Sequence, residues 1–196
     1  AATAAALTTA GARVTVLGTG AQARAHLHTL IGLGRFTDFT VVGRDPEKAR
    51  RLAAEFADAG VRAGELEPSI RDADVIACCT SATSPLFDGS LVAPHAAIAA
   101  MGTFKLTDRE RDDQIMSRSS IWVESLETAL TEAGDIHYVL ESGAITADSL
   151  RTLAQLVAPG ERIDFTRPRV FKSCGMSWED LAVAAELLCQ HELARG

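Results

Sequence analysis

A short glycine motif, GTGAQA at residues 18–23, is the clearest chemical signal in the sequence. Gly18 allows a tight turn out of a strand, Gly20 lets the backbone approach a pyrophosphate, and Ala23 lets a helix pack closely on a sheet. The N–H groups at the start of that helix then point at the phosphates. The motif alone also fits an ordinary glycine turn. The residues expected to hold the pyrophosphate are Gly18, Thr19, Gly20, Ala21 and Gln22.

The pattern around the motif favours the phosphate-binding interpretation. Residues 14–17 form an apolar or β-branched run, which is typical of a strand covered on both faces. After the motif, Ala23, Leu27, Leu30 and Ile31 recur at the spacing of one helical face. A second apolar run then closes a βαβ unit, which is the setting in which this motif binds a dinucleotide.

The end of the second expected strand, residues 39–42, indicates which dinucleotide is bound. An Asp or Glu there would bind the ribose 2′-hydroxyl of NAD, but the chain has Gly43 followed by Arg44. The glycine leaves room for a 2′-phosphate and the arginine offers it a charge-assisted partner, although Arg44 could also be a plain surface residue. Asp45 could be an NAD-binding acid, but its place before Pro46 suits a helix N-cap better. NADP(H) is therefore preferred, with NAD(H) as the alternative.

The order of elements predicts the fold class. Short apolar runs alternate with amphipathic stretches, which is typical of βαβ units in an α/β protein with a doubly wound, mostly parallel sheet of the Rossmann type. A mixed-charge stretch at residues 108–113 is expected to be an exposed helix start. The last helix is apolar on more than one face, so it needs neighbours on several sides. Further strands are expected at residues 61–63, 75–79, 97–100 and 121–124, and later helices at residues 150–157 and about 178–193.

Composition and charge exclude several classes of protein. The 196 residues are 47% hydrophobic and 23% charged, unlike a disordered tail, a collagen-like fibre or a coiled-coil rod. The 19 basic and 26 acidic residues give a net charge of −7 without a basic stripe, so no nucleic-acid partner is expected. The longest apolar runs are too short to span a bilayer, so no membrane partner is expected either. The start of the chain does not resemble a signal peptide, and a cytoplasmic protein is expected.

The cysteines, histidines and serines suggest neither disulfides, a metal site nor a hydrolase. Cys78 and Cys79 are adjacent, a poor framework for disulfides, and are expected as small core side chains. None of the five histidines has the spacing of zinc ligands. His26 and His28 lie two residues apart on a helix and are expected at the surface. Ser81 lacks the sequence context of a hydrolase nucleophile.

Four longer stretches resemble one known family. They are VTVLGTGAQARAHL, VVGRDPEKA, DADVIACCTSATSPLF and VFKSCGMSWEDLAVAA, and together they resemble the ornithine cyclodeaminase/mu-crystallin family from about residue 11 to the C-terminus. The family includes NAD-dependent cyclodeaminases, alanine dehydrogenases and NADPH-dependent ketimine reductases, which reduce cyclic imino acids such as pyrroline-2-carboxylate and piperideine-2-carboxylate. The resemblance implies a small imino or amino acid as substrate and a homodimer.

The resemblance also implies which loops surround the nicotinamide half of the cofactor. Three loops are involved, and two of them follow the strands expected at residues 75–79 and 97–100. The residues are Thr80, Ser81 and Ala82 on the ribose side, Met101 and Gly102 near the nicotinamide, and Ser173, Cys174 and Gly175 over the ring. The pyrophosphate and 2′-phosphate positions it implies are those of the glycine motif and Arg44.

Phe104 is a departure from part of the family. Cyclodeaminases and alanine dehydrogenases carry an aspartate two residues after the glycine that matches Gly102, where this chain has Phe104. A phenylalanine can neither shuttle a proton nor hold an ammonium by charge, so this favours the imino-acid reductases, which the segment VESLETALTEAGDI also resembles. Core packing beside the sheet is the alternative role for Phe104. Lys105 is expected either to contact a substrate carboxylate or to be a solvated loop lysine.

The start of the chain is the second departure. Family members carry a segment before the Rossmann domain that supplies much of the dimer interface, together with an arginine and a lysine that bind the substrate carboxylate and assist proton transfer. We expect residues 1–12 to be a remnant of that substrate and dimerisation domain, 13–166 to be the dinucleotide-binding domain, and 167–196 to return to and pack on the first. The proton donor stays unassigned.

The function predicted from all of this is NADPH-dependent reduction of the C=N bond of a small cyclic imino acid by hydride transfer. Two alternatives remain open. One is a cyclodeaminase or an alanine or amino-acid dehydrogenase of the same family. The other is a non-catalytic, crystallin-like module that binds NADPH.

Overall fold

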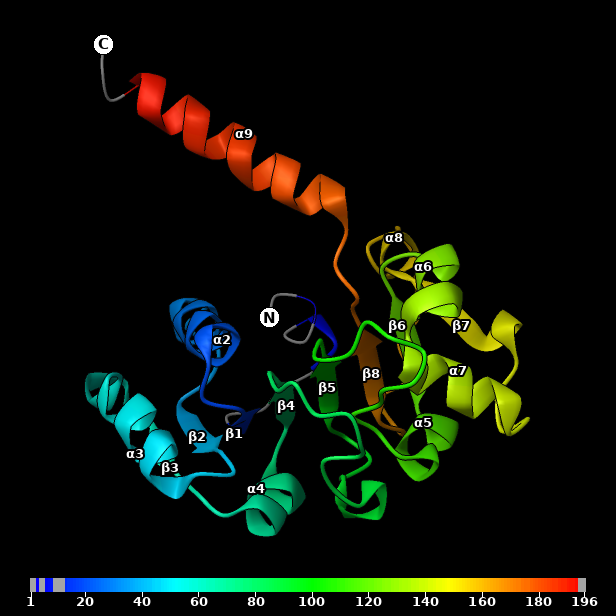
Figure 1. The fold of residues 1–196 in the computed structure, drawn as a ribbon, viewed down its shortest axis with the longest axis horizontal. Coiled ribbons are helices and arrows are strands. Elements are labelled where there is room, and N and C mark those ends of the chain that lie inside the picture. The colour runs from blue at the N-terminus through cyan, green and yellow to red at the C-terminus, as the bar shows by residue number, and fades with distance from the viewer. Residues whose placement is uncertain (1–2, 4–5, 9–12, 194–196) are drawn as a thin grey trace.

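A parallel sheet of eight strands organises the chain (Figure 1). The structure is a computed structural model that describes residues 3, 6–8 and 13–193, so most of the expected remnant at residues 1–12 lies outside the described residues. The strand order is β3-β2-β1-β4-β5-β8-β6-β7. The strands are β1 (Arg13–Leu17), β2 (Asp38–Val42), β3 (Arg62–Ala63), β4 (Val75–Cys78), β5 (Ala97–Ala100), β6 (Ser120–Val123), β7 (Leu150–Thr152) and β8 (Arg169–Lys172).

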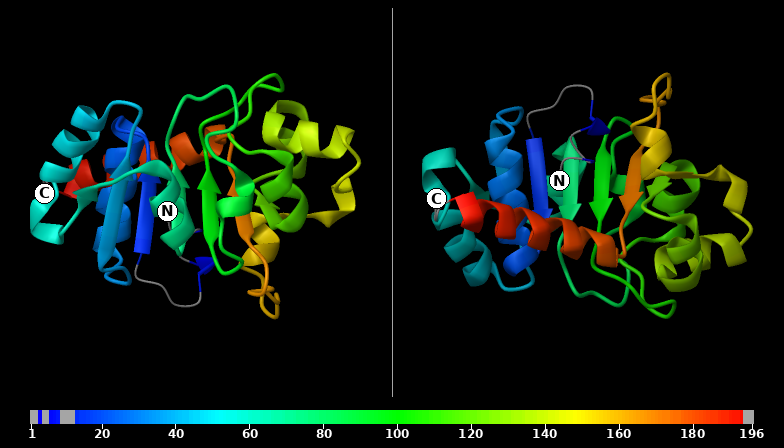
Figure 2. Two further views of the ribbon diagram at one scale, coloured as in Figure 1. Left: turned by 90° about the horizontal axis from the view of Figure 1, so that it is seen from below. Right: turned by 90° about the horizontal axis from the view of Figure 1, so that it is seen from above.

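Helices cover both faces of this sheet, which confirms the doubly wound α/β fold (Figure 2). Along β4, Val75 and Ala77 face the helices that follow β1 and β2, while Ile76 and Cys78 face the opposite side. The main helices are α2 (Ala21–Gly32), α3 (Pro46–Ala54), α4 (Leu66–Asp72), α5 (Asp113–Arg118), α6 (Leu126–Glu132), α7 (Gly134–Glu141), α8 (Leu153–Leu156) and α9 (Ser177–Leu193). Three short 3₁₀ turns add η1 (Ala57–Ala59), η2 (Gly89–Leu91) and η3 (Ala147–Ser149).

Strand β8 enters the middle of the sheet although it comes last along the chain. It pairs with β5 on one side and with β6 on the other, so the segment expected from residue 167 as a return segment begins with a strand of the sheet. Its two terminal residues, Arg169 and Lys172, are charged and yet fully buried. The Arg169 guanidinium is satisfied by backbone carbonyls, including those of Leu7 and Arg167 at 2.8 and 3.0 Å.

The helix expected at residues 150–157 is in fact divided between a strand and a helix. Residues Leu150–Thr152 form β7, which pairs with β6, and the short helix α8 follows directly. Thr152 ends the strand and starts the helix, because its hydroxyl accepts from the Gln155 N–H while the Gln155 side chain accepts from the Thr152 N–H. A capping box thus overrides the helical spacing of the apolar residues.

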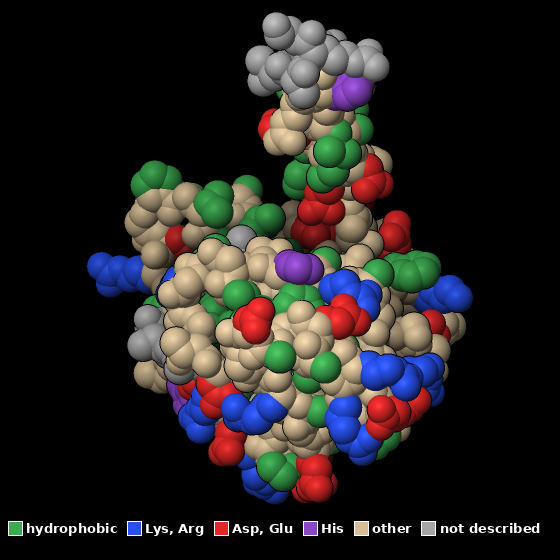
Figure 3. All heavy atoms as spheres, turned by 90° about the vertical axis from the view of Figure 1, so that its left-hand side faces the viewer, with side chains coloured by type: hydrophobic (Ala, Val, Ile, Leu, Met, Phe, Trp, Pro, Cys, Tyr) green, Lys and Arg blue, Asp and Glu red, His purple; other side chains and the backbone are tan. Residues whose placement is uncertain are grey.

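Helix α9 leaves the end of β8 and extends away from the sheet and its helices (Figure 1). In the space-filling view it stands off the body of the molecule and carries hydrophobic side chains along its length (Figure 3). Its large apolar side chains are mostly exposed, for example Leu181 at 69% and Leu188 at 64%. None of the helices in the described part of the chain is long and apolar enough to cross a membrane.

Candidate dinucleotide site

The expected cofactor residues follow the carboxyl ends of five strands that are consecutive in the sheet, β2, β1, β4, β5 and β8. Because all the pairings recorded between these strands are parallel, these ends lie along one edge. The strand order reverses direction between β1 and β4, and ligands of open α/β sheets bind in the crevice at such a switch point. The loops singled out in the sequence therefore meet at the edge where a dinucleotide is expected.

The turn between β1 and α2 requires glycine at its first position. Gly18 has φ +116°, in the region that favours glycine, and a Cβ there would lie 2.2 Å from the Cys79 carbonyl oxygen. Gly20 is different, because a Cβ there would meet nothing within 4 Å. The exposed Gly20, Ala21 and Gln22 therefore border open space, which fits close approach of a pyrophosphate to the backbone.

The N-terminus of α2 faces this space with its first turn uncapped by any side chain of the described residues. Ala23 is fully buried against the sheet, as close helix packing requires. His26 is also buried, so the expectation that it lies at the surface was wrong: its Nδ1 lies 2.8 Å from the Gln22 carbonyl oxygen, and burial lowers its pKa. The amide groups of the first turn are thus available to an anion.

The end of β2 offers a cation beside the motif. A Cβ on Gly43 would lie 2.7 Å from the Thr19 Cγ2 atom, so β2 and the glycine motif approach closely there. Arg44 is exposed, and no hydrogen bond or ion pair of its side chain is seen among the described residues. Asp45 caps α3, as predicted: its carboxylate accepts from the Glu47 and Lys48 N–H groups at 2.9 and 3.3 Å, and these bonds lower its pKa.

The loops after β4 and β5 are joined by a buried carboxylate. Glu110 is fully buried and accepts from the Thr80 hydroxyl at 2.5 Å and from the Gly102 N–H at 2.9 Å. The Ala82 N–H in turn donates to the Thr80 hydroxyl at 3.2 Å. Glu110 was not among the residues predicted from the sequence, because the stretch 108–113 was expected to be exposed. That expectation was wrong, since the central pair of the stretch is buried and the other four residues are half-buried.

The burial of this pair could have been suspected from the next residue, Asp112. Asp112 caps α5 by accepting from the Ile115 N–H at 3.0 Å, so the helix begins after the pair and not within it. Glu110 and Arg111 precede the cap as two adjacent opposite charges, and both are buried. The Arg111 guanidinium donates to the Glu110 carbonyl oxygen at 2.7 Å and lies over the Phe87 ring.

A second buried pair lies beside the first. The Asp135 carboxylate accepts from the Glu110 and Arg111 N–H groups, both at 2.8 Å, and from the Thr103 hydroxyl at 3.0 Å. The Lys172 Nζ atom, at the end of β8, donates to the Thr103 carbonyl oxygen at 2.5 Å and lies 3.9 Å from Asp135. Neither residue was singled out in the sequence, where Lys172 looks like an ordinary charge at the end of an apolar run.

Glu124 shapes the loop after β8. Its carboxylate accepts from the Ser173 hydroxyl at 2.5 Å, the Cys174 N–H at 3.3 Å and the Gly175 N–H at 3.0 Å. Gly175 has φ +85°, which favours glycine. Burial raises the pKa of the Cys174 thiol. The loop expected to cover the nicotinamide is therefore held by Glu124, which directly follows β6 and was not among the residues predicted from the sequence.

Phe104 and Lys105 follow the Gly102 loop on the surface. Phe104 is 62% exposed, so in the described chain it does not pack in the core, and that alternative was wrong. Lys105 is exposed, and no ion pair of its ammonium is seen among the described residues. Met101 is half-buried beside Gly102. The exposed side chains of Phe104 and Lys105 are thus available to a ligand near this loop.

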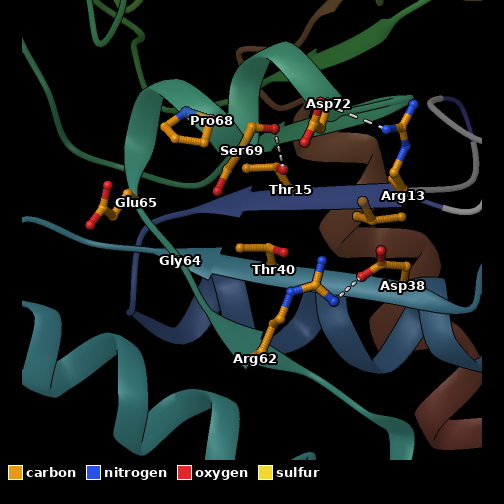
Figure 4. Close-up of a pocket in the computed structure, with 11 residues that line it drawn as sticks. Arg13, Thr15, Asp38, Thr40, Arg62, Gly64, Glu65, Pro68, Ser69 and Asp72 are labelled. Carbon is orange, nitrogen blue, oxygen red and sulfur yellow. Dashed lines mark hydrogen bonds and ion pairs between the residues drawn. The ribbon is translucent and has the colours of Figure 1, made fainter.

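Two hollows in the described surface lie away from the glycine motif. One of about 340 Å³ lies on the face of β1, β2 and β3 beside α4, where Thr15 and Thr40 line it (Figure 4). Arg62 pairs there with Asp38, at the amino end of β2. The other, of about 400 Å³, borders the loop after β4 and is lined by Thr83, Ser84, Pro85, Thr107, Arg109, Asp113 and Tyr138.

The described residues contain no group of histidines, cysteines and acids that could hold a metal ion. The four cysteines are free. Cys78 is buried in the core, as expected, whereas Cys79 is only partly buried against it, and burial raises the pKa of Cys79 to about 12. The thiols of Cys78 and Cys79 are therefore protonated at neutral pH.

Comparison with known proteins identifies relatives along nearly the whole chain. The model of the ornithine cyclodeaminase/mu-crystallin family matches residues 2–191. The chain is 35% identical over 173 residues to the ketimine reductase mu-crystallin of Rattus norvegicus, covering 88% of this chain and 53% of the relative. It is 34% identical over 168 residues to the Delta(1)-pyrroline-2-carboxylate reductase of Paracoccus denitrificans, covering 83% and 52%. The chain thus spans about half the length of these curated relatives.

Solved structures show the same fold. The Delta(1)-pyrroline-2-carboxylate reductase of Thermococcus litoralis, in complex with NADH and L-proline, matches with a TM-score of 0.86 and 25% identity, covering 98% of this chain and 62% of that one. The iminosuccinate reductase of Paracoccus denitrificans, in complex with NAD+, matches with a TM-score of 0.86 and 28% identity, covering 97% and 62%.

Proposed function

Because the chain belongs to the ornithine cyclodeaminase/mu-crystallin family, we propose that it is the cofactor-binding part of an enzyme that reduces the C=N bond of a small cyclic imino acid. The observation that carries the proposal is the meeting of the glycine turn, the Gly102 loop and the Ser173 loop at one sheet edge. Phe104, in place of an acid, supports a reductase over a cyclodeaminase. The reductases among its relatives support the same choice.

A nicotinamide dinucleotide bound at this edge would supply the hydride that the imine carbon accepts. The chain's own part is to bind and orient. The uncapped first turn of α2 would hold the pyrophosphate, and the open side of Gly20 would admit it. The loop that Glu124 holds, residues 173–175, would cover the ring and exclude water. The proton donor would come from outside the assigned residues, while exposed Lys105 would be available to contact the substrate carboxylate.

NADP(H) is the cofactor we propose, with NAD(H) as the alternative. The exposed Arg44 directly after Gly43 supports this choice, because its side chain is available to a 2′-phosphate while Asp45 is engaged in capping α3. The two solved relatives described above were obtained with NADH and NAD+, so the choice needs its own test.

Replacing Arg44 provides that test. Arg44→Ala should weaken NADPH binding about tenfold or more and leave NADH binding within about twofold, because only NADPH carries the 2′-phosphate. Titration of both cofactors, followed by protein fluorescence, measures the two dissociation constants. Arg51→Ala, which removes another arginine nearby on α3, is the matched control and should change neither. An equal loss for both cofactors would exclude the 2′-phosphate role.

The reaction is tested by steady-state assays on the full-length protein. NADPH oxidation should be fast with pyrroline-2-carboxylate or piperideine-2-carboxylate and slow with pyruvate plus ammonia. The reverse preference would support an amino-acid dehydrogenase, and release of ammonia from ornithine would support a cyclodeaminase. Cofactor binding without turnover of any of these substrates would support a non-catalytic module.

We also propose that the protein is a homodimer and that it is cytoplasmic. The apolar side chains exposed along α9 support its packing on a substrate and dimerisation domain, and hence a homodimer. The four free cysteines fit a reducing, cytoplasmic environment.

A further inference from the structure

Glu110 connects two loops that come from different strands and that the proposed function places around the nicotinamide. Thr80 follows β4, and Gly102 follows β5. Both donate to the same carboxylate, Thr80 through its hydroxyl at 2.5 Å and Gly102 through its N–H at 2.9 Å. Since Glu110 is fully buried, these bonds do not compete with water. One side chain thus sets the separation of the two loops.

The packing around Gly102 shows how tightly that separation is fixed. A Cβ on Gly102 would lie 2.2 Å from a carboxylate oxygen of Glu110 and 2.2 Å from the Thr80 carbonyl oxygen. Neither contact could be accommodated without moving one of the loops. The backbone of Gly102 is therefore held between Glu110 on one side and the loop after β4 on the other.

The backbone of Glu110 is itself held by a hydrogen bond to the Asp135 carboxylate. That carboxylate accepts from the Glu110 N–H at 2.8 Å and from the Thr103 hydroxyl at 3.0 Å, so it holds both Glu110 and the residue after Gly102. Lys172 adds a bond to the Thr103 carbonyl oxygen. The two buried acids and the two buried bases, Arg111 and Lys172, balance in formal charge, so the network buries no net formal charge.

From this network we infer that Glu110 is a positioning residue, which holds the loops of Thr80 and Gly102 at the spacing that the nicotinamide half of the cofactor requires. The inference rests on the proposed function, because it concerns the same edge of the sheet. Glu110 acts through Thr80 and Gly102 and does not touch the cofactor. The adenosine half, held by the glycine motif and Arg44, should not depend on Glu110.

Binding measurements can separate the two halves of the cofactor. We compare NADPH with 2′-phosphoadenosine 5′-diphosphoribose, which lacks the nicotinamide. In the wild type NADPH should bind more tightly than this fragment. The ratio of the two dissociation constants is the nicotinamide advantage. In Glu110→Ala the fragment should bind as in the wild type, whereas the advantage of NADPH should disappear. In the full-length enzyme the same variant should lower kcat about 100-fold, with a smaller rise in the KM of NADPH.

Asp112→Ala is the matched control for a merely structural effect. Asp112 is two residues away and accepts from the Gly89 and Ile115 N–H groups, and among the described residues no hydrogen bond joins its side chain to either loop. It should lower the stability and leave the nicotinamide advantage and kcat unchanged. Glu110→Gln keeps an oxygen that can accept from Gly102 and should restore part of the loss. If Glu110→Ala does not fold, Glu110→Gln alone tests the inference, because it keeps an acceptor for only one of the two donors and should reduce the same advantage.

The outcomes distinguish the inference from the proposed function. If the wild type binds neither NADPH, NADH nor the fragment, the proposed function fails, and the inference fails with it. If the wild type binds NADPH and Glu110→Ala or Glu110→Gln retains the full nicotinamide advantage and kcat, only the inference is overturned. The inference is equally overturned if Asp112→Ala causes the same loss as Glu110→Ala.

Discussion

At the scale of single residues, Gly18 and Gly20 illustrate two different reasons for a glycine. Gly18 is fixed by its own conformation and by the Cys79 carbonyl oxygen, so its requirement belongs to the fold. Gly20 has φ −92° and open space around it, so nothing in the fold requires it. A ligand whose phosphates approach the backbone would require it. The requirement for glycine therefore comes from folding at position 18 and from ligand binding at position 20.

Replacing each glycine by alanine should separate the two effects. Gly18→Ala should lower the free energy of unfolding by about 2–4 kcal/mol, since the added Cβ meets a carbonyl oxygen and the left-handed φ is unfavourable. Gly20→Ala should change it by less than about 1 kcal/mol, yet weaken NADPH binding about tenfold or more. Urea unfolding and cofactor titration measure the two quantities. Equal stability of the two variants, or unchanged binding by Gly20→Ala, would contradict this account.

The cysteines should differ in their reactivity for reasons of burial. In the 196-residue chain at about pH 8, exposed Cys189 should react quickly with a thiol-specific reagent. Partly buried Cys79 should react slowly and fully buried Cys78 only after unfolding, because burial raises the pKa of both thiols. Cys174 should react slowly, and NADPH should slow it further if its loop covers the cofactor. Mass spectrometry of labelled peptides measures each site. Rapid labelling of Cys78 in the native protein would show that the sheet is less protected than described.

At the scale of elements, some segments could be predicted and others could not. The β1–α2–β2 unit was predictable because its apolar runs and helical spacing are uninterrupted, and Asp45 before Pro46 marks the start of α3. Strand β8 was not, because Arg169 and Lys172 at its ends look like surface charges. Tertiary partners that lie far away in the sequence satisfy both residues, so no local pattern reports their burial.

The same limit applies to the candidate site. The glycine turn and the cap at Asp45 are local, and their residues carry their own signals. The network around Glu110 and Asp135 joins residues from 80 to 172. A single sequence shows such residues as ordinary charges, because only the fold brings the opposite charges together.

The cap of α3 should give a pH-dependent contribution to stability. The backbone bonds at Asp45 lower its pKa in the folded protein, so its contribution is complete above the pKa of the unfolded state and is lost as the pH falls through the folded value. Asp45→Ala should therefore have a lower urea midpoint than the wild type at pH 7, and the difference should shrink as the pH falls below 3.8, the ordinary pKa of an aspartate. Asp58→Ala is the control, because Asp58 lies in the exposed turn η1, in which no side-chain cap hydrogen bond is formed. A constant difference across this range would contradict the cap's electrostatic role.

At the scale of the whole molecule, α9 is the element whose surface is least explained by the described chain. Trp178, Leu181, Val183, Leu187 and Leu188 are all more than half exposed. An isolated helix with this surface is expected to pack on something. The proposed substrate and dimerisation domain would supply that neighbour, and the chain's coverage of about half of its relatives leaves room for one.

A charge placed on α9 tests this proposal. In the full-length protein, Leu187→Glu should shift the sedimentation coefficient from dimer to monomer, because a carboxylate is costly in an apolar interface. Gln190→Glu adds the same charge where a polar side chain already stands, and it should leave the dimer largely intact. A monomeric wild type, or a Leu187→Glu variant that remains dimeric, would contradict the proposed role of α9.

The central claim, reduction of an imine with a cofactor held at the carboxyl edge of the sheet, is tested most directly by tracing the hydride. The full-length protein is incubated with pyrroline-2-carboxylate and NADPH that carries deuterium at C4 of the nicotinamide, on both faces. The account predicts proline with one deuterium at its α-carbon, detected by mass spectrometry and NMR, and the same label is expected in the product of piperideine-2-carboxylate. Proline without deuterium, or no proline while NADPH binds, would contradict it.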